Sequence, residues 1–281
     1  MMKKIFMLIL LSSFTSAGYA QLYNNEWIDY NKVYYKFKVG QFGYDNTLLS
    51  PIRKGLVRIT QPVLAAAGLG NTTSQDFQLI RDGEEVPLFI STITGILSPT
   101  DYIEFWGEMA NGKTDKALYR DSTFQLSDHW NLQTDSATYF LTVNTGGNNK
   151  RFVQTTNDIS SASIAPEKNF MFTTGKYFRD TINYGYGFFR EQRLYSSSYD
   201  LGEGFTSRSV KNYNPLTQTF SKLYADTAGT DFTVKLSMVG NWPAPRDVKI
   251  LLNNDSLTQF PMGYFQSKIS ITDGIAANRL K

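Results

Sequence analysis

The sequence predicts an all-β fold: an antiparallel β-sandwich domain with one short helix, followed by a second β domain that is incomplete. Aromatic residues make up 15% of the chain, including 17 tyrosines and 20 phenylalanines, and aromatic residues are enriched in strands. Short segments with alternating apolar and polar residues recur, separated by Gly, Asn, Asp and Pro. Long runs of helix formers are missing, which favours a sandwich or barrel.

The first 20 residues are typical of a secretory signal peptide. Two lysines precede an apolar run over residues 5–11, and Gly18 and Ala20 stand where a signal peptidase cleaves. The run is too short to span a bilayer, which needs about 20 apolar residues. We therefore expect a mature chain that begins near Gln21 and is exported to the periplasm, the outer membrane surface or the cell exterior.

The composition excludes several classes of function. The chain contains no cysteine, so it has no thiol nucleophile and no thiolate metal ligand, and no disulfide stabilises it after export. The formal net charge of +3 includes the lysines of the signal, so the mature chain is nearly neutral and we expect no nucleic-acid partner. No later segment is long and apolar enough for a transmembrane helix.

The first strands follow the signal. Residues 33–40 (VYYKFKVG) and 55–60 (GLVRIT) have apolar side chains at every second position, which predicts strands with one buried face. Residues 41–54 lie between them and contain the breakers Gly43 and Pro51. We interpret this intervening segment as a long surface loop.

A helix and a hairpin come next. Residues 61–70 (QPVLAAAGLG) predict the one short helix, because Pro62 suits a first helical turn and three alanines follow. Residues 77–90 (FQLIRDGEEVPLFI) predict a β-hairpin with an Asp-Gly turn. Pro87 cannot donate a backbone hydrogen bond, so we expect the return strand at a sheet edge or with a bulge.

Residues 101–108 (DYIEFWGE) predict a strand that separates a core from a half-exposed aromatic surface. Side chains alternate between the two faces of a strand, so Ile103 and Phe105 point toward the core. The opposite face carries the residues that we select as a possible interaction surface: Tyr102, Glu104 and Trp106.

Two chemical interpretations of this face compete with simple packing. Glu104 and Glu108 share it, but at about 3.3 Å per residue they lie roughly 13 Å apart, too far for a glycosidase pair. Tyr102 and Trp106 have rings that suit stacking on a sugar, although aromatic residues on sheets more often pack beneath another element.

The rest of the chain predicts further strands around a looser region. Residues 136–144 (SATYFLTVN), 231–240 (DFTVKLSMVG) and 247–256 (DVKILLNNDS) alternate as strands do, and the last ends in a turn. Two or three strands do not bury a core alone. The predicted organisation is a signal peptide (1–20), an N-terminal β-rich domain (21–155), an aromatic and glycine-rich connecting region (156–220) and a partial β-sandwich domain (221–281).

Few residues are candidates for catalysis or metal binding. His129 is the only histidine. Asp128 is badly placed to orient it as a general base, because adjacent residues of an extended chain face apart, so we expect a surface-loop histidine. Asp115, Asp121 and Asp128 lie in loops, but no loop has the spacing of a calcium-binding loop. We expect no catalytic residue, no metal and no cofactor, with calcium as the minor alternative.

Five segments together resemble the N-terminal region of gingipain-like proteins of Bacteroidetes, most closely the PorU-type sortases of the type IX secretion system. They are residues 23–39, 55–69, 77–89, 101–121 and 196–207. The resemblance extends from Tyr23 to about Gln266, and DYIEFWGE with the following NGKTD is its most telling block. The loop at residues 40–54 is longer than the usual connection, and the resemblance ends after Gln266.

The resemblance implies β-rich N-terminal domains that precede a caspase-like cysteine peptidase domain with a Cys and His dyad. Sortases of this kind remove C-terminal sorting signals from cargo and attach the cargo to a lipopolysaccharide anchor at the outer membrane surface. The present chain has no cysteine, and His129 lies in the pre-catalytic region. No catalytic residue is carried over, and we expect this chain itself not to be an enzyme.

Three hypotheses about function follow. The first is an exported, non-catalytic module, a truncated or frameshifted relative of such a sortase, that docks to a secretion-system component or to an absent peptidase domain. The second is a fragment of an active peptidase or sortase whose catalytic Cys and His lie beyond residue 281. The third is a carbohydrate-binding β-sandwich that stacks sugars on Trp106.

Overall fold

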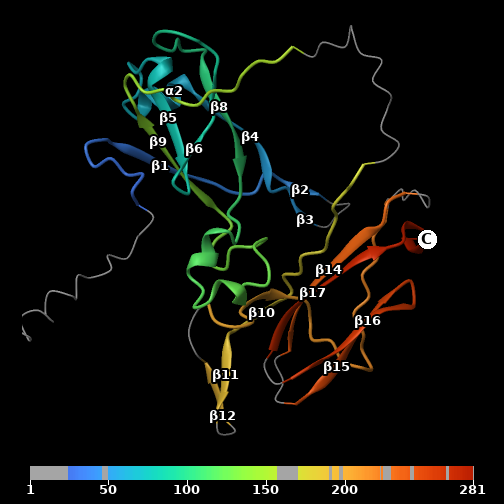
Figure 1. Ribbon diagram of the computed structural model, residues 1–281. Coiled ribbons are helices and arrows are strands. Elements are labelled where there is room, and N and C mark those ends of the chain that lie inside the picture. Colours follow the sequence, from blue (N-terminus) through green and yellow to red (C-terminus); the bar gives the residue numbers. More distant parts are fainter. Residues whose placement is uncertain are drawn as a thin grey trace, which may run out of the picture. The chain divides into compact units, whose positions relative to one another are not determined.

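A computed structural model describes the chain over residues 25–45, 50–156, 170–189, 192–195, 199–221, 223, 229–240, 244–263 and 266–280. The predicted signal peptide at residues 1–20 lies outside this part. The described residues form strands with a single short α-helix, so the predicted all-β fold class is confirmed (Figure 1). In the same residues, no helix has the length and apolar character needed to cross a membrane.

The chain divides into two compact units, each assembled from separate stretches of sequence. Unit 1 comprises Met1–Phe37, Leu56–Trp106 and Thr138–Phe152. Unit 2 comprises Lys38–Gly55, Gly107–Ala137 and Val153–Lys281.

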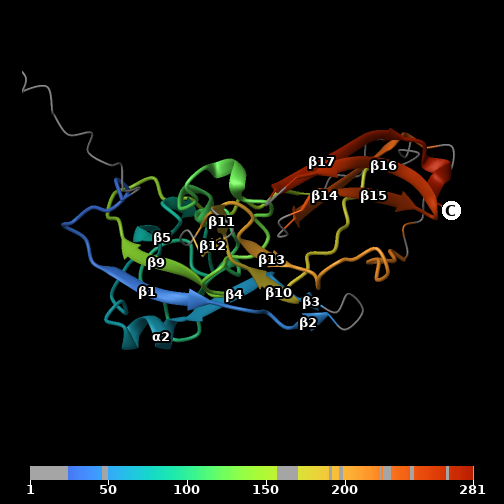
Figure 2. The ribbon, with the colours of Figure 1, turned by 90° about the horizontal axis from the view of Figure 1, so that it is seen from below.

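Two sheets lie mostly within unit 1 (Figure 1, Figure 2). The first has the strand order β1-β9-β5-β6, formed by β1 (Tyr34–Val39), β9 (Ala137–Val143), β5 (Phe77–Arg81) and β6 (Glu84–Val86). The second has the order β4-β8-β7, formed by β4 (Lys54–Thr60), β8 (Tyr102–Glu108) and β7 (Phe89–Ile90).

Aromatic side chains from both sheets form the core of unit 1. Phe37 of β1 stacks on Tyr139 of β9, with ring centroids 5.7 Å apart. Phe105 of β8 meets both rings, at 5.9 Å from Phe37 and 5.1 Å from Tyr139. Phe105 and Ile103 have no exposed surface, as the alternation of β8 predicts. Burial of such large apolar side chains is the main term that holds a sandwich together.

The predicted helix of unit 1 is present. The hairpin predicted over residues 77–90 is present only as far as Val86, because Phe89–Ile90 pair with β8 in the second sheet. The helix α2 spans Gln61–Ala66, with a proline in its first turn. Strands β5 and β6 pair in antiparallel fashion around a two-residue turn, in which Asp82 and Gly83 have φ angles of 50° and 82°. Such positive angles suit Asp-Gly and match the twist of the flanking strands. Strand β6 lies at the edge of its sheet, as Pro87 predicts.

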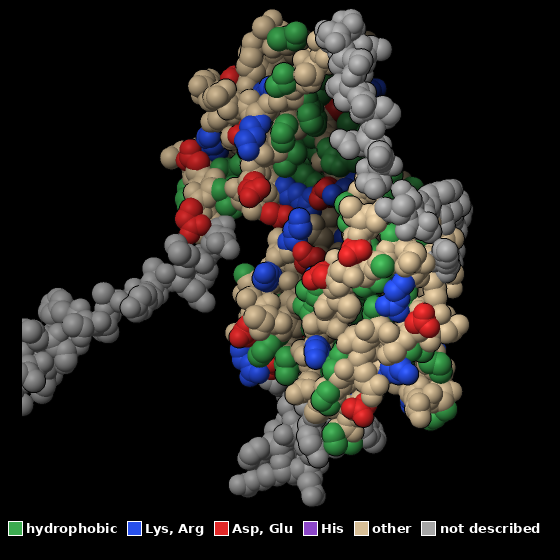
Figure 3. Space-filling view, turned by 45° about the vertical axis from the view of Figure 1, so that its right-hand side comes forward, with side chains coloured by type: hydrophobic (Ala, Val, Ile, Leu, Met, Phe, Trp, Pro, Cys, Tyr) green, Lys and Arg blue, Asp and Glu red, His purple; other side chains and the backbone are tan. Residues whose placement is uncertain are grey.

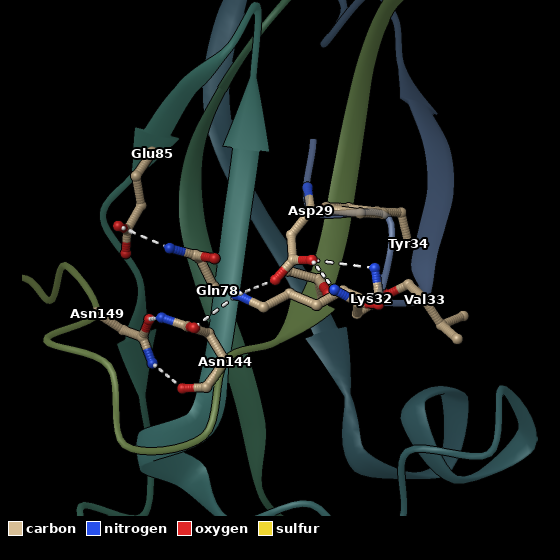
Figure 4. A network of polar contacts seen from close by, with 10 residues as sticks. Asp29, Lys32, Val33, Tyr34, Gln78, Glu85, Asn144 and Asn149 are labelled. Carbon is tan, nitrogen blue, oxygen red and sulfur yellow. Dashed lines mark hydrogen bonds and ion pairs between the residues drawn. The ribbon is translucent and has the colours of Figure 1, made fainter. Parts of the chain in front are cut away.

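A polar network ties the segment before β1 to the first sheet of unit 1 (Figure 4). The Lys32 ammonium donates to the side-chain oxygen of Asn144 at 2.6 Å, and the Asn144 amide donates to Asn149 at 2.7 Å. Beside them, Gln78 of β5 donates to Glu85 of β6 at 3.0 Å. Segments far apart in the sequence are therefore joined at one place.

Unit 2 contains five two-stranded antiparallel sheets among its described residues. One of them lies within the predicted surface loop at residues 41–54. The paired strands are β2 (Tyr44–Asp45) with β3 (Ser50–Pro51), β10 (Thr181–Asn183) with β13 (Gly204–Thr206), β11 (Tyr186–Phe189) with β12 (Gln192–Tyr195), β14 (Phe232–Gly240) with β17 (Gln266–Ile275), and β15 (Arg246–Leu252) with β16 (Asp255–Met262).

Short 3-10 turns in the chain cover Ser74–Asp76, Thr114–Ala117, Ser122–Phe124 and Ala277–Leu280.

The alternating segments at residues 231–240 and 247–256 form β14 and β15 as predicted, but the last four strands of unit 2 bury few side chains. Asn253 and Asn254 form the turn between β15 and β16 with φ angles of 49° and 70°, as the sequence predicts. Met262 and Ile275 are buried, whereas Leu236 in β14 remains partly exposed. Two-stranded sheets have limited independent stability, and few buried contacts hold these four strands together.

Candidate interaction surface

The pairing of β4 with β8 determines which side chains share the outer face of the second sheet. The Gln61 N–H donates to the Asp101 carbonyl at 2.9 Å, and the Met109 N–H donates to the Arg53 carbonyl at 2.8 Å. Both bonds fit the same antiparallel register of β4 with β8. Arg58 therefore stands opposite Glu104, and the next outward pair along the face is Leu56 with Trp106.

Arg58 forms the polar part of this face. Its guanidinium contacts the Glu104 carboxylate through two nitrogens, each 2.7 Å from Oε1. It also lies 3.8 Å from the centre of the Tyr102 ring. The hydrogen bond to Glu104 raises the pKa of Arg58. Arg58 thus covers Tyr102 and neutralises Glu104, which is itself buried.

Three apolar side chains make up the rest of the surface. Trp106 is 53% exposed and Leu56 is 57% exposed. Phe89 of β7 stands opposite Glu104 and is 43% exposed, and its ring lies 6.2 Å from that of Tyr102. Figure 3 shows one face of the molecule, on which hydrophobic side chains lie among acidic and basic ones. We call the six residues of this sheet face the outer-sheet surface: Leu56, Arg58, Phe89, Tyr102, Glu104 and Trp106.

The approach to β8 is fixed by a carboxylate. Asp101 accepts hydrogen bonds from the hydroxyl of Ser91 at 2.7 Å and from the hydroxyl of Ser98 at 2.6 Å. The Ser98 backbone N–H also donates to it at 2.7 Å. These bonds, that from the Ser98 hydroxyl first, lower the pKa of Asp101 well below its usual range. These hydrogen bonds therefore fix the position of the loop that connects β7 to β8, next to the outer-sheet surface.

The sequence selects three of the six surface residues, Tyr102, Glu104 and Trp106. The structure places all three on the outer face of β8, and it adds Arg58, which contacts two of them. Leu56 and Phe89 were also missed. The alternation of GLVRIT contains the signal for β4, because Leu56 and Arg58 alternate with the inward-facing Val57 and Ile59.

The second carboxylate considered for glycosidase chemistry is engaged elsewhere. Glu108 forms an ion pair with Lys54, with a distance of 2.5 Å between the charged atoms. Glu104 is paired with Arg58. Each carboxylate therefore has its own cationic partner on the neighbouring strand.

His129 lies in unit 2 and packs against aromatic rings. Its imidazole stacks on the Tyr177 ring with centroids 3.7 Å apart. The Ser127 hydroxyl accepts a hydrogen bond from the His129 backbone N–H, not from the ring. Within the described residues, the imidazole makes no hydrogen bond to a serine hydroxyl. The arrangement thus lacks the contact between base and nucleophile that defines a catalytic triad.

The three aspartates considered as calcium ligands are not brought together as a metal site. Asp115 is buried and accepts from the Asn131 amide at 2.5 Å and from the Leu132 N–H at 2.9 Å. Asp121 accepts from the Thr123 N–H at 2.8 Å at the start of a 3-10 turn. In the part of the chain that the structure describes, no group of three or more His, Asp or Glu side chains is arranged to hold a metal ion.

Comparisons with protein-family models, with curated protein sequences and with solved structures found no match for this chain.

Proposed function

We propose that this chain is an exported, non-catalytic β module that docks to a protein partner through the outer-sheet surface. The observation that carries the proposal is the exposed pair Leu56 and Trp106, held beside the fixed Arg58–Glu104 ion pair on a three-stranded sheet. The resemblance to gingipain-like sortases suggests the class of partner, a secretion-system component or a peptidase domain of that family.

The chemistry of the surface supports a protein partner. Tryptophan and arginine are among the residues that most often dominate the energy of protein interfaces, and they do so when neighbouring groups exclude water. Here Arg58 is held by Glu104 and Tyr102, so little of its conformational freedom remains to be lost on binding. Trp106 presents a large apolar side chain at a rigid backbone position.

A carbohydrate ligand is the second candidate, because the half-exposed Trp106 ring offers a stacking face. The geometry favours it less than a protein. The Tyr102 ring, which would extend the platform, has the Arg58 guanidinium 3.8 Å from its centre. A sugar that used both rings would have to displace Arg58 from Tyr102 and from Glu104.

Site-specific photocrosslinking in cells that export the chain tests the proposal. A photoreactive phenylalanine analogue replaces Trp106 in one variant and the exposed Val63 of α2 in the matched control. We expect a defined adduct with an envelope protein at position 106 and none at position 63. Leu56→Ser in the same background should reduce that adduct about fivefold or more, because it removes the apolar neighbour of residue 106.

Two results would contradict docking through this surface. One is equal crosslinking at positions 63 and 106, and the other is no adduct at position 106. Quenching of tryptophan fluorescence by soluble glycans, present in the wild-type chain and lost in Trp106→Phe, would favour the carbohydrate ligand instead.

A further inference from the structure

Residues 176–180, called the strap here, lie across the loop that contains the only histidine of the chain. The His129 imidazole stacks on Tyr177 of the strap, with centroids 3.7 Å apart and an angle of 4° between the ring planes. The Trp130 indole N–H donates to the Tyr177 carbonyl at 3.5 Å. At the other end of the strap, Arg179 forms an ion pair with Asp135 at 2.8 Å. All of these residues belong to unit 2.

The surroundings of the His129 ring contain a partly buried positive group. Arg53 lies 4.5 Å from the centre of the Trp130 ring, and that ring packs against His129 with centroids 4.8 Å apart and an angle of 83° between the planes. The Arg53 Nη1 atom is buried and makes no hydrogen bond within the described residues. Burial lowers the pKa of Arg53. Arg179 already lies 5.0 Å from the centre of the same Trp130 ring, so protonation of His129 would add a third positive charge to this cluster.

Other charged groups near the ring have opposing effects. Asp128 attracts a protonated imidazole, and the Tyr177 ring stabilises a cation that stacks on it. The charges of Arg179 and Asp135 neutralise each other in their ion pair. Burial first, and then Arg53, outweigh these attractions and lower the pKa of His129 to about 4.

The lowered pKa of His129 links protonation of its imidazole to the position of the strap. A histidine exposed to water has a pKa of about 6.5. The pKa of His129 would rise toward that value if the strap lifted away from its ring, because the face that Tyr177 covers would regain water while Arg53 stayed in place. The contribution of the neutral imidazole to the closed state is complete above about pH 6.5, and it is lost as the pH falls through about 4.

We propose that His129 is an acid-sensitive latch: the neutral imidazole holds the strap against residues 128–135, and protonation releases the strap and uncovers the Trp130 side chain. This inference is independent of the docking function proposed above, because it concerns different residues in a different unit. The two can therefore fail separately.

Nitroxide labels measure the opening directly, since a chain without cysteine accepts labels only at introduced positions. The labelled positions are the exposed Lys116→Cys and Lys176→Cys, and the distance between them is measured by pulsed electron paramagnetic resonance. From pH 7.5 to pH 4.5 we expect the population at the longer distance to increase about tenfold or more. The same change in pH also affects carboxylates, so a control is needed.

The controls carry substitutions that cannot titrate in this range. His129→Gln and His129→Phe retain a flat side chain that can stack on Tyr177, and every carboxylate stays in place. We expect both to keep the short distance at pH 4.5, and Tyr177→Ser to show the long distance at pH 7.5. If His129→Gln opens the strap at neutral pH, His129→Phe still provides the comparison.

Three outcomes would overturn the latch. Acid opening of equal size in the wild-type and His129→Phe backgrounds would assign the effect to carboxylates. An unchanged distance in the wild type down to pH 4.5 would show that protonation does not release the strap. The single imidazole also gives one set of nuclear magnetic resonance signals, and an apparent pKa near 6.5 without any opening would remove the thermodynamic link.

Discussion

At the scale of single residues, Gly112 shows why the NGKTD block needs a glycine. Its backbone N–H donates to the Asp128 carbonyl at 2.8 Å, and its carbonyl accepts from the Gln125 side chain at 2.5 Å. A Cβ atom built at Gly112 would lie 2.6 Å from the carbonyl oxygen of Trp130. Because that oxygen belongs to the backbone, it cannot move aside as a flexible side chain does.

Gly112→Ala should therefore destabilise unit 2 by about 2–4 kcal/mol, as overpacking against a rigid neighbour does. Urea unfolding measures the loss. Gly146→Ala is the matched control, because Gly146 has a φ of 70° but no atom within 4 Å of the added Cβ. It should cost only about 1 kcal/mol through backbone strain. Equal losses in the two variants would contradict the steric explanation.

Arg151 is a second residue whose contacts define its role. One nitrogen of its guanidinium donates to the carbonyls of Ser74, Gln75 and Phe77 at 3.0, 2.9 and 2.9 Å. The neighbouring backbone pairs with Leu88 on both sides, through Lys150 and Phe152. The side chain therefore fastens the last stretch of unit 1 to the start of β5.

Arg151→Ala should reduce the free energy of unfolding of unit 1 by about 1–3 kcal/mol, because the half-buried carbonyls lose a charged donor. The exposed Arg208 also donates to carbonyls, those of Asn214 and Pro215. Arg208→Ala should cost under about 1 kcal/mol, since water replaces its bonds. Chemical denaturation of the two variants compares them, and a larger effect at Arg208 would count against the assigned role of Arg151.

At the scale of elements, the two faces of β8 have different roles: one face packs in the core, and the other carries the proposed docking surface. Phe105 has no exposed surface and packs on Phe37 and Tyr139. Its neighbour Trp106 is half-exposed on the other face. Phe105→Ala should destabilise unit 1 by about 3–5 kcal/mol, whereas Trp106→Ala should cost about 1 kcal/mol or less.

Thermal and urea unfolding of these two variants test the assignment of the faces. Trp106→Ala should keep the fold, with a urea midpoint close to that of the wild type. A Trp106 variant as unstable as the Phe105 variant would mean that Trp106 belongs to the core, and the outer-sheet surface would lose its central residue.

The elements also show which features could be predicted from the sequence and why others could not. Alternation over a few residues predicted β1, β4, β8, β9, β14 and β15, and turn chemistry predicted the hairpin of β5 and β6. Both signals are local. The contact of Arg58 with Glu104 joins residues 46 positions apart, and it depends on the register of two strands, which their separate patterns do not specify.

The short strands between residues 181 and 206 illustrate a different limit. Three-residue strands such as β10 and β13 are too short for an alternating pattern to be distinct from loop sequence. Long-range contacts stabilise this region instead. The Tyr119 hydroxyl donates to the Glu203 carbonyl at 2.9 Å, and Arg120 pairs with Asp200 at 2.7 Å.

At the scale of the whole molecule, some ionisable groups stabilise the protein less as the pH falls, and others stabilise it less as the pH rises. His129 has a lowered pKa, so its contribution weakens as the solution becomes acidic. Asp115 and Glu203 are buried carboxyl groups, and desolvation raises the pKa of each. Their contributions weaken as the solution becomes basic. The stability of unit 2 should therefore lose the contribution of His129 in acid and lose the contributions of Asp115 and Glu203 as the pH rises.

Glu203 offers a test of the contribution to stability that is lost as the pH rises. Its pKa is raised in the folded state, by burial first, so the protonated form is favoured there. The contribution of the protonated carboxyl is complete below the unfolded value of about 4.3, and it is lost as the pH rises through the folded value. In Glu203→Gln, the new amide oxygen can still accept the hydrogen bond that the Asp200 N–H now makes to Glu203 at 3.0 Å.

We therefore expect Glu203→Gln to raise the urea midpoint of unit 2 at pH 8 and to leave it unchanged at pH 3.5, because the amide is neutral at both values. Glu84→Gln, at an exposed position of β6, serves as the control and should change neither midpoint. If Glu203→Gln is less stable than the wild type at pH 8, the ionised carboxylate contributes more through its hydrogen bond than its burial costs, and the balance assigned to Glu203 is wrong.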